Sequence, residues 1–144
     1  MIEFDAQNDF ILSDAEAIQR WIAHIITKEH HEVGDISYVF CDDNELHKIN
    51  LEYLNHDTFT DIISFDYTVD KTVHGEIFIS TDRVQENAIQ FNVSFQDELL
   101  RVMIHGVFHF LGYPDASDEE KMRMRRKEDE ALKLYSDKFS QPTD

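Results

Sequence analysis

Cysteine is almost absent from this chain of 144 residues, which carries a single thiol at Cys41. One cysteine excludes an internal disulfide, and a lone thiol is typical of a reducing compartment, so we expect a cytoplasmic protein. No apolar run approaches the roughly 18 residues that span a membrane. Residues 1–10 carry three acidic side chains and no basic segment before an apolar run. We therefore do not expect a signal peptide.

Proline and glycine are also scarce, at two and four residues. No linker rich in proline, glycine or serine divides the chain, and there is no internal repeat. We therefore expect a single domain over residues 1–144, with a frayed tail at 141–144. Hydrophobic residues make up 42% of the sequence, a composition that is typical of a packed globular core and not of a disordered chain.

Basic residues are few, because 13 Lys and Arg stand against 30 Asp and Glu, for a net charge of −17. This balance argues against a protein that binds nucleic acid through a broadly basic surface. The densest run of cations comprises Lys121, Arg123, Arg125, Arg126 and Lys127, beside Glu119, Glu120, Glu128 and Asp129. Such a mixture at helical spacing usually forms a solvated, self-paired face, and we favour that interpretation over contacts with an RNA backbone.

Hydrophobic periodicity predicts four strands, at 2–5, 36–41, 61–67 and 75–80, and five helices. The helices are expected to start near Ser13, Asp43, Thr81, Ser94 and Ser117 and to end near Gly34, Leu54, Phe91, Leu111 and Tyr135. Capping-box spacing supports three of the starts, by Ser13 with Glu16, Ser94 with Asp97 and Ser117 with Glu120. The order of elements predicts an α+β fold in which a mixed sheet of about four strands packs with about five helices.

The same periodicity predicts which side chains are buried. The second helix is expected to bury Leu46, Ile49, Tyr53 and Leu54. Met122 and Met124 are expected to pack from the last helix. Cys41, at the end of a strand, is expected to lie in the core.

The segment with the clearest chemistry contains His105 and His109, four residues apart on a predicted helix. This spacing places both imidazoles on one face, close enough to bind one metal ion. The pair alone is also compatible with two ordinary helical histidines, one of them packed against the core.

The residues after this pair favour a metal site. Gly112 permits a positive φ and Pro114 prevents the helix from continuing, so the chain must turn. A reversal after Gly112 can bring Asp115 back to the face that carries the histidines. Three ligands then come from one segment and leave a position for water, which is the arrangement of a catalytic zinc ion. Alternatively, Asp115 is an ordinary turn aspartate.

The predicted helix is zincin-like but lacks the glutamate of the protease motif His-Glu-x-x-His, because Gly106 follows the first histidine. A peptidase mechanism would therefore lack its proton acceptor. Glycine at this position leaves room for close helix packing or for a bulky substrate. The reacting group would be a metal-bound water, and no general base can be assigned. Ser64 and Glu76 are candidates to line the cleft, but we favour a structural hydroxyl for Ser64 and a solvated or salt-bridged carboxylate for Glu76.

These motifs resemble the YbeY family of bacterial rRNA maturation factors, which are metal-dependent, single-strand-specific endoribonucleases. The family helix reads His-Gly-x-Leu-His-Leu-x-Gly-Tyr-Asp-His, and the matching segment runs from His105 to Asp115. Three further stretches resemble family motifs, namely Thr60-Asp61-Ile62-Ile63-Ser64-Phe65, Gly75-Glu76-Ile77-Phe78-Ile79-Ser80 and Asn50-Leu51-Glu52-Tyr53-Leu54. Order and spacing agree from about Ile36 to Tyr135.

The chain departs from the family pattern at two positions. Asp115 stands where the third ligand is usually histidine, which adds a negative charge and could shift preference from Zn²⁺ toward a harder ion such as Mn²⁺. Leu54 stands where many members carry an arginine thought to contact RNA, so that contact cannot be transferred to this chain.

The resemblance implies hydrolysis of single-stranded RNA at a zinc ion held by His105, His109 and Asp115, at the 3′ end of 16S rRNA and in ribosome quality control. It implies the small ribosomal subunit and its assembly proteins as partners, and neither DNA nor a membrane. Two other classes stay open on the residues alone. One is a ribosome-assembly factor whose metal is structural, and the other is an Fe(II) oxygenase with two histidines and one carboxylate, whose ligands normally come from separate strands.

Overall fold

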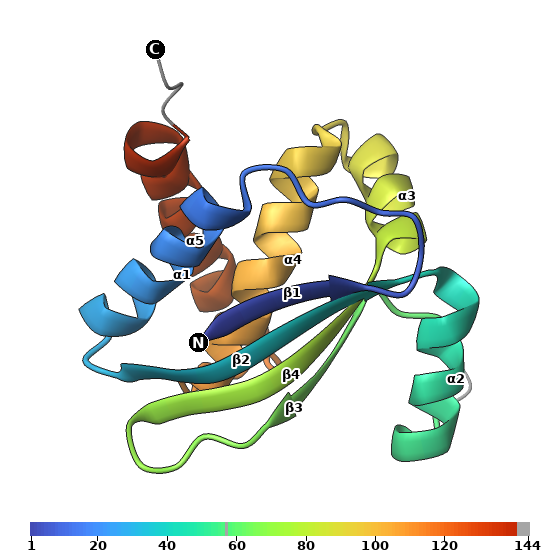
Figure 1. Ribbon diagram of the computed structural model, residues 1–144, viewed down its shortest axis with the longest axis horizontal. Helices are drawn as coiled ribbons and strands as arrows, with labels where there is room; N and C mark the ends of the chain where they lie inside the picture. The colour runs from blue at the N-terminus through green and yellow to red at the C-terminus, as the bar shows by residue number, and fades with distance from the viewer. Residues whose placement is uncertain (57, 141–144) are drawn as a thin grey trace.

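Four strands form one mixed sheet in the computed structural model, which describes residues 1–56 and 58–140 (Figure 1). The strands are Ile2–Ala6 (β1), Glu32–Cys41 (β2), Ile62–Asp66 (β3) and Thr72–Ser80 (β4). Their order in the sheet is β1-β2-β4-β3, in which β2 pairs in parallel with β1 and β4, whereas β3 pairs with β4 antiparallel. The predicted tail at 141–144 lies outside the described residues.

Five α-helices accompany the sheet, followed by one short π-helix. They are Ala15–Lys28 (α1), Asp43–Leu54 (α2), Thr81–Phe91 (α3), Phe95–Phe110 (α4), Asp118–Leu134 (α5) and the π-helix Tyr135–Phe139 (η1). The predicted α+β class and the number of strands and α-helices are therefore confirmed for the described residues. None of these helices combines the length and the apolar character needed to cross a membrane.

The main core lies between one face of the sheet and the helices α1, α4 and α5. The Tyr38 hydroxyl of β2 donates a hydrogen bond to the Met103 carbonyl of α4 at 2.9 Å. The Trp21 indole of α1 donates to the Ala131 carbonyl of α5 at 2.8 Å. Both side chains are fully buried, so these bonds satisfy their polar atoms and fix how the helices sit on the sheet.

Helix α4 approaches the sheet closely because Gly106 faces it. A Cβ atom at this position would lie 2.9 Å from Cδ1 of Ile77 on β4 and 3.2 Å from Cδ1 of Ile62 on β3. The glycine thus serves close helix packing, one of the two roles expected for it. This contact sets the histidine face of α4 beside the edge strand β3.

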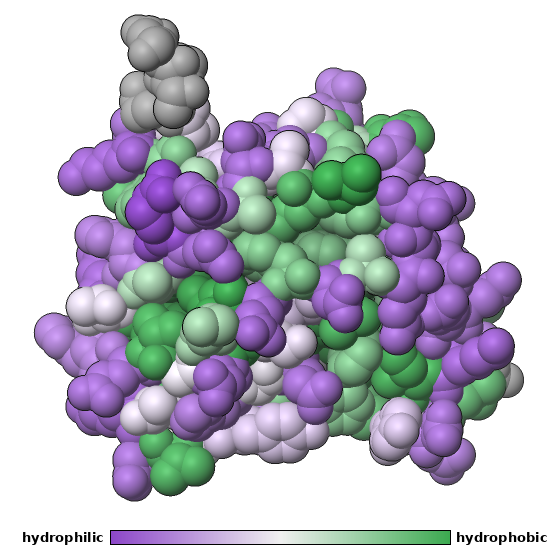
Figure 2. All heavy atoms as spheres, viewed as in Figure 1, coloured by the Kyte–Doolittle hydropathy of each residue, from purple (hydrophilic) through white to green (hydrophobic). Residues whose placement is uncertain are grey.

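A second, smaller apolar cluster lies on the opposite face of the sheet, where Leu46 of α2 packs with Cys41 and Ile63. Cys41 is fully buried, as predicted. Figure 2 shows apolar side chains exposed near β1, surrounded by hydrophilic ones. They belong to a groove between β1 and the segment before α1. This groove is lined by Phe4, Phe10, Leu12 and Phe40 among others. It shares no residue with the pocket described below.

Several helix boundaries follow the predicted caps. The side chains of Ser80, Ser94 and Ser117 accept hydrogen bonds from backbone N–H groups at the starts of α3, α4 and α5. The first helix differs from the prediction at both ends. Its N-cap is Asp14 and not Ser13, and it ends at Lys28 rather than continuing to Gly34.

The extension to Gly34 was wrong because the chain reverses earlier. His30 takes a left-handed φ of 63°, and Glu32 already belongs to β2. Gly34 therefore lies inside the strand, where a Cβ would come within 2.6 Å of the Val73 carbonyl of β4. The glycine marks a close approach of two strands.

The predicted buried face of α2 was only partly correct. Leu46 is buried, but Tyr53 and Leu54 are 65% and 42% exposed. Helix α2 lies at one end of the sheet (Figure 1), so its last turn has little to pack against. Met124 of α5 is buried as predicted, whereas Met122 is 61% exposed on the outer side of the helix.

Candidate metal centre

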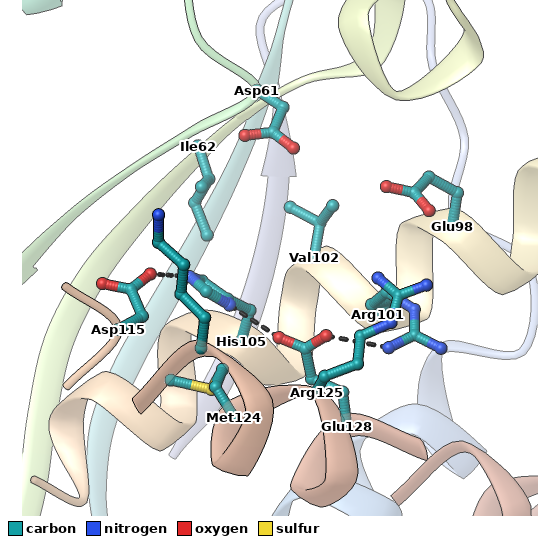
Figure 3. Close-up of a pocket in the computed structure, with 11 residues that line it drawn as sticks. Asp61, Ile62, Glu98, Arg101, Val102, His105, Asp115, Met124, Arg125 and Glu128 are labelled. Carbon is teal, nitrogen blue, oxygen red and sulfur yellow. Dashed lines mark hydrogen bonds and ion pairs between the residues drawn. The ribbon is translucent and has the colours of Figure 1, made fainter. Parts of the chain in front are cut away.

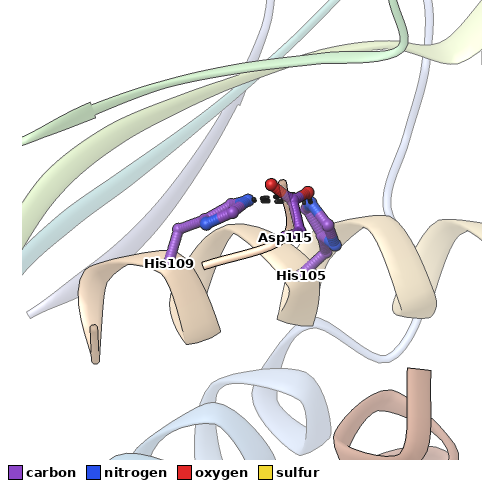
Figure 4. A group of neighbouring side chains, drawn as sticks. All are labelled: His105, His109 and Asp115. Carbon is purple, nitrogen blue, oxygen red and sulfur yellow. Dashed lines mark hydrogen bonds and ion pairs between the residues drawn. The ribbon is translucent and has the colours of Figure 1, made fainter. Parts of the chain in front are cut away.

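Helix α4 and the turn after it bring three potential ligands together. His105 and His109 lie one turn apart on the same face of α4. Beyond the helix, Gly112 takes a φ of +98°, and the N–H of Tyr113 donates to the Phe108 carbonyl. The chain thus folds back, and Figure 4 shows the Asp115 carboxylate above both imidazoles.

The spacing of these ligand atoms suits a small tetrahedral ion. The two Nε2 atoms are 3.0 Å apart, and Oδ2 of Asp115 lies 3.2 Å from that of His105 and 3.3 Å from that of His109. Around a tetrahedral zinc ion with bonds of about 2.0–2.1 Å, ligand atoms are separated by about 3.3 Å. The three side chains could therefore hold one metal ion.

The hydrogen bonds of the other ring nitrogens also favour a cation at this point. Nδ1 of His109 lies 3.0 Å from the Tyr113 carbonyl, and Nδ1 of His105 lies 2.7 Å from a carboxylate oxygen of Glu128. Both partners only accept hydrogen bonds, so each Nδ1 carries a proton. In neutral imidazoles both Nε2 atoms then present lone pairs, which face each other and a carboxylate. Three acceptors this close require a positive charge between them.

Glu128 of α5 links His105 to a second residue of α4, Arg101. Its side chain is buried, at 5% exposure, and its second oxygen accepts a hydrogen bond from Arg101 at 2.8 Å. Arg101 also donates to Asp129 at 2.6 Å. Figure 3 shows the chain of contacts from His105 through Glu128 to Arg101. The prediction that Glu128 belongs to a solvated face is wrong, because α5 turns this residue toward α4.

The electrostatics of this cluster favour positive charge on its members. Burial opposes the charged form of His105, but the hydrogen bond and charge of Glu128, with the charge of Asp115, outweigh burial and raise the pKa of His105 above its usual value. The carboxylates thus stabilise a cation at this end of α4, whether a proton or a metal ion.

The turn that carries Asp115 is also held by contacts of Tyr113. The Tyr113 hydroxyl donates to Glu29, the C-cap residue of α1, at 2.6 Å, and Lys127 of α5 donates to the same carboxylate at 2.7 Å. The Lys127 ammonium also lies 5.0 Å from the centre of the Tyr113 ring. This arrangement links the turn to two helices and fixes the approach of Asp115 to the histidines.

A pocket of about 330 Å³ opens beside this group and includes two of the three potential ligands, His105 and Asp115. We call it the metal pocket; its lining is Asp61, Ile62, Glu98, Arg101, Val102, His105, Asp115, Lys121, Met124, Arg125 and Glu128 (Figure 3). Burial raises the pKa of both Asp61 and Glu98. Buried carboxyls with raised pKa values beside a cluster of charged groups are typical of functional sites.

The other candidates from the sequence lie apart from this pocket. Ser64 lines a separate cleft with Leu54, His56 and Thr60. That cleft shares Ile62 with the metal pocket, so the two adjoin along β3. Glu76 points to the opposite face of the sheet, where it accepts a hydrogen bond from the Tyr67 hydroxyl at 3.2 Å. The structure therefore does not bring Glu76 to the metal centre.

The predicted cationic run divides between several environments. Lys121 and Arg125 line the metal pocket, and Lys127 pairs with Glu29 at the end of α1. Arg123 and Arg126 are exposed. Arg123 and Arg126 thus fit the expected solvated face. Glu128 and Asp129 instead pair with Arg101 of α4, and Lys127 pairs with Glu29, outside this run.

Sequence reasoning missed Glu98, Arg101 and Glu128. For the first two a signal existed, because Glu98 and Arg101 precede His105 by seven and four residues and so share its helix face. No comparable signal existed for Glu128, since its role depends on how α5 packs against α4.

Comparison with known proteins gives consistent results. A family model described as Endoribonuclease YbeY matches residues 3–136. The Endoribonuclease YbeY of Christiangramia forsetii is 54% identical over 134 residues, covering 93% of this chain and 94% of that protein. The protein of the same name from Flavobacterium johnsoniae is 51% identical over 135 residues, covering 94% and 97%.

A solved structure supports the fold. The solution structure of TM1509 from Thermotoga maritima is similar to this chain with a TM-score of 0.68 and 26% sequence identity. The match covers 100% of this chain and 97% of that one.

Proposed function

Because the chain belongs to the Endoribonuclease YbeY family, we propose that it is a metal-dependent endoribonuclease that hydrolyses phosphodiester bonds in single-stranded RNA. The observation that carries the metal dependence is the triangle of ligand atoms from His105, His109 and Asp115, with sides of 3.0, 3.2 and 3.3 Å. Curated relatives that cover nearly the whole chain carry the name endoribonuclease, which supports the reaction class.

The bound ion, Zn²⁺ in this proposal, would polarise a phosphoryl oxygen or lower the pKa of a bound water. The chain's own residues orient the centre. His109 is fixed by the Tyr113 carbonyl and His105 by Glu128. The carboxylate of Asp115 makes the centre less positive than a set of three histidines would, so other divalent ions such as Mn²⁺ are also candidates.

The substrate in this proposal is ribosomal RNA. The family resemblance implies the 3′ end of 16S rRNA, a role in ribosome quality control, and association with the small ribosomal subunit in the cytoplasm. With a net charge of −17 the molecule repels RNA at long range. Local cations must therefore hold the backbone, and Lys121 and Arg125 are placed for this at the metal pocket.

The test is cleavage of a labelled single-stranded RNA and of its duplex by the zinc-loaded protein. The proposal predicts cleavage of the single strand only, its loss with a chelator, and its return with zinc. The variant His109→Ala should lose cleavage, whereas Asp115→His, which restores the usual family ligand, should retain it. A protein that binds zinc and unfolds on its removal, but cleaves no RNA when loaded, would instead be an assembly factor with a structural metal.

A further inference from the structure

Glu98 is a buried carboxyl group whose role the metal centre does not explain. Its side chain is only 6% exposed, yet among the described residues it has no hydrogen-bond or ion-pair partner. It lies on α4, two turns before His105, and Figure 3 shows its carboxyl group pointing into the metal pocket. Its oxygen atoms are not among the fully buried side-chain atoms that lack a partner, so they are open to the pocket and can accept hydrogen bonds from a ligand bound there.

The surroundings of Glu98 indicate the kind of ligand. Val102 and Met124 are buried side chains that form apolar walls, together with Ile62 of β3. Asp61 lies across the pocket and carries a second carboxyl group (Figure 3). The interior therefore combines apolar contacts with hydrogen-bond acceptors. A volume of about 330 Å³ is at the lower end of small-ligand pockets, which suits one nucleotide.

The distribution of charge argues for a base inside and a phosphate at the mouth. Carboxyl groups in the interior would repel phosphate oxygens. The two cations with free access to solvent, Lys121 and Arg125, are exposed residues of α5 at the pocket. Arg101 is already engaged by Glu128 and Asp129. A nucleotide placed this way directs its phosphate toward solvent-accessible cations and its base toward Glu98.

We propose that the metal pocket is a base-recognition subsite, in which Glu98 accepts hydrogen bonds from the exocyclic amino group of an unpaired base, with cytosine favoured over uracil. This inference rests on the proposed action on single-stranded RNA and names a specificity for the same site. Carboxylates accept from the N4 amino group of cytosine, whereas uracil presents a carbonyl oxygen at the same position. Splayed single-stranded bases are commonly read in this way by proteins.

The comparison of cytosine with uracil isolates this contact, because the two bases have the same size and differ mainly at that edge. We would measure by fluorescence anisotropy the affinity of the zinc-loaded protein for labelled oligocytidine and oligouridine of equal length. We expect oligocytidine to bind roughly tenfold more tightly, in keeping with one base-edge contact. The variant Glu98→Gln, whose amide can also donate to a carbonyl, should remove most of that difference.

A matched control is Glu130→Gln, which removes the same charge from an exposed residue of α5 outside the pocket. It should keep the preference of the wild type. Zinc content and melting temperature of each variant show whether the metal centre and the fold are intact.

The outcomes separate this inference from the proposed function. Equal affinity for the two oligonucleotides, or a preference that survives in Glu98→Gln, overturns the subsite even if RNA is cleaved. A preference that depends on Glu98 in a protein that cleaves neither oligonucleotide supports the subsite and contradicts the nuclease proposal. Absence of binding to either oligonucleotide overturns the subsite.

Discussion

Replacing Glu128 by glutamine tests how far the metal centre depends on a residue that touches no ion. The carboxylate lies 2.7 Å from Nδ1 of His105 and accepts from Arg101 at 2.8 Å. Glutamine has the same shape and its carbonyl can still accept the Nδ1 proton, so His105 keeps its orientation. What is lost is the negative charge, which makes this hydrogen bond roughly twice as strong as a neutral one. The acceptor for Arg101 is lost as well, because the amide nitrogen then faces its guanidinium group.

The expected effect is a loss of zinc affinity of about 10- to 100-fold, the usual result of removing such a partner from a ligating histidine. This corresponds to about 1.4 to 2.7 kcal/mol of binding free energy. The assay is competition with a chromophoric zinc chelator, and Glu130→Gln is the control for loss of a surface carboxylate from the same helix. Zinc affinity within error of the wild type, in a Glu128→Gln protein that is folded, would refute the account of how His105 is held.

Two further predictions concern stability. Burial raises the pKa of Glu98 in the folded protein above its unfolded value of about 4.3. The stability that protonation of Glu98 contributes is therefore fully present below the unfolded pKa, and it is lost as the pH rises through the folded pKa. Glu98→Gln should therefore have a higher free energy of unfolding than the wild type near neutral pH. This difference, measured by urea unfolding, should shrink as the pH is lowered to about 4. A difference that does not change with pH would contradict the raised pKa of Glu98. Gly112→Ala places a Cβ in open space but at a φ of +98°, so backbone strain alone should lower the free energy of unfolding in urea by about 1–2 kcal/mol. The same strain should displace Asp115 and weaken zinc binding. Unchanged stability would contradict this account of the turn.

The sequence predicted that His105, His109 and Asp115 would lie together because all three belong to one short segment. The positions of His105 and His109 depend only on helical periodicity, and the return of Asp115 depends on Gly112 and Pro114 next to it. These rules depend only on residues that are close together in the sequence, so they can be applied without knowing the tertiary structure. For the same reason the serine caps of α4 and α5 were predicted correctly.

The errors arose where position in the fold decides burial. Tyr53 and Leu54 follow the apolar pattern of a helix, but the last turn of α2 extends past the sheet and leaves them exposed. Glu128 belongs to a run of charges that looks solvated in the sequence, and only the packing of α5 on α4 buries it beside His105. No local pattern contains that information.

Glu98 and Arg101 are an intermediate case. Both lie on the histidine face of α4 at helical spacing, so the pattern that pointed to the two histidines also contained their neighbours. Their part in the site became clear only with the pocket, because the sequence does not tell which helix face opens to a cavity.

The central claim is that His105, His109 and Asp115 hold one metal ion, and its most direct test is elemental analysis of protein purified without chelator. The account predicts about one zinc ion per chain in the wild type, and loss of that ion in both His109→Ala and Asp115→Ala. A wild-type protein that remains free of zinc and other divalent metals after both are supplied would contradict it.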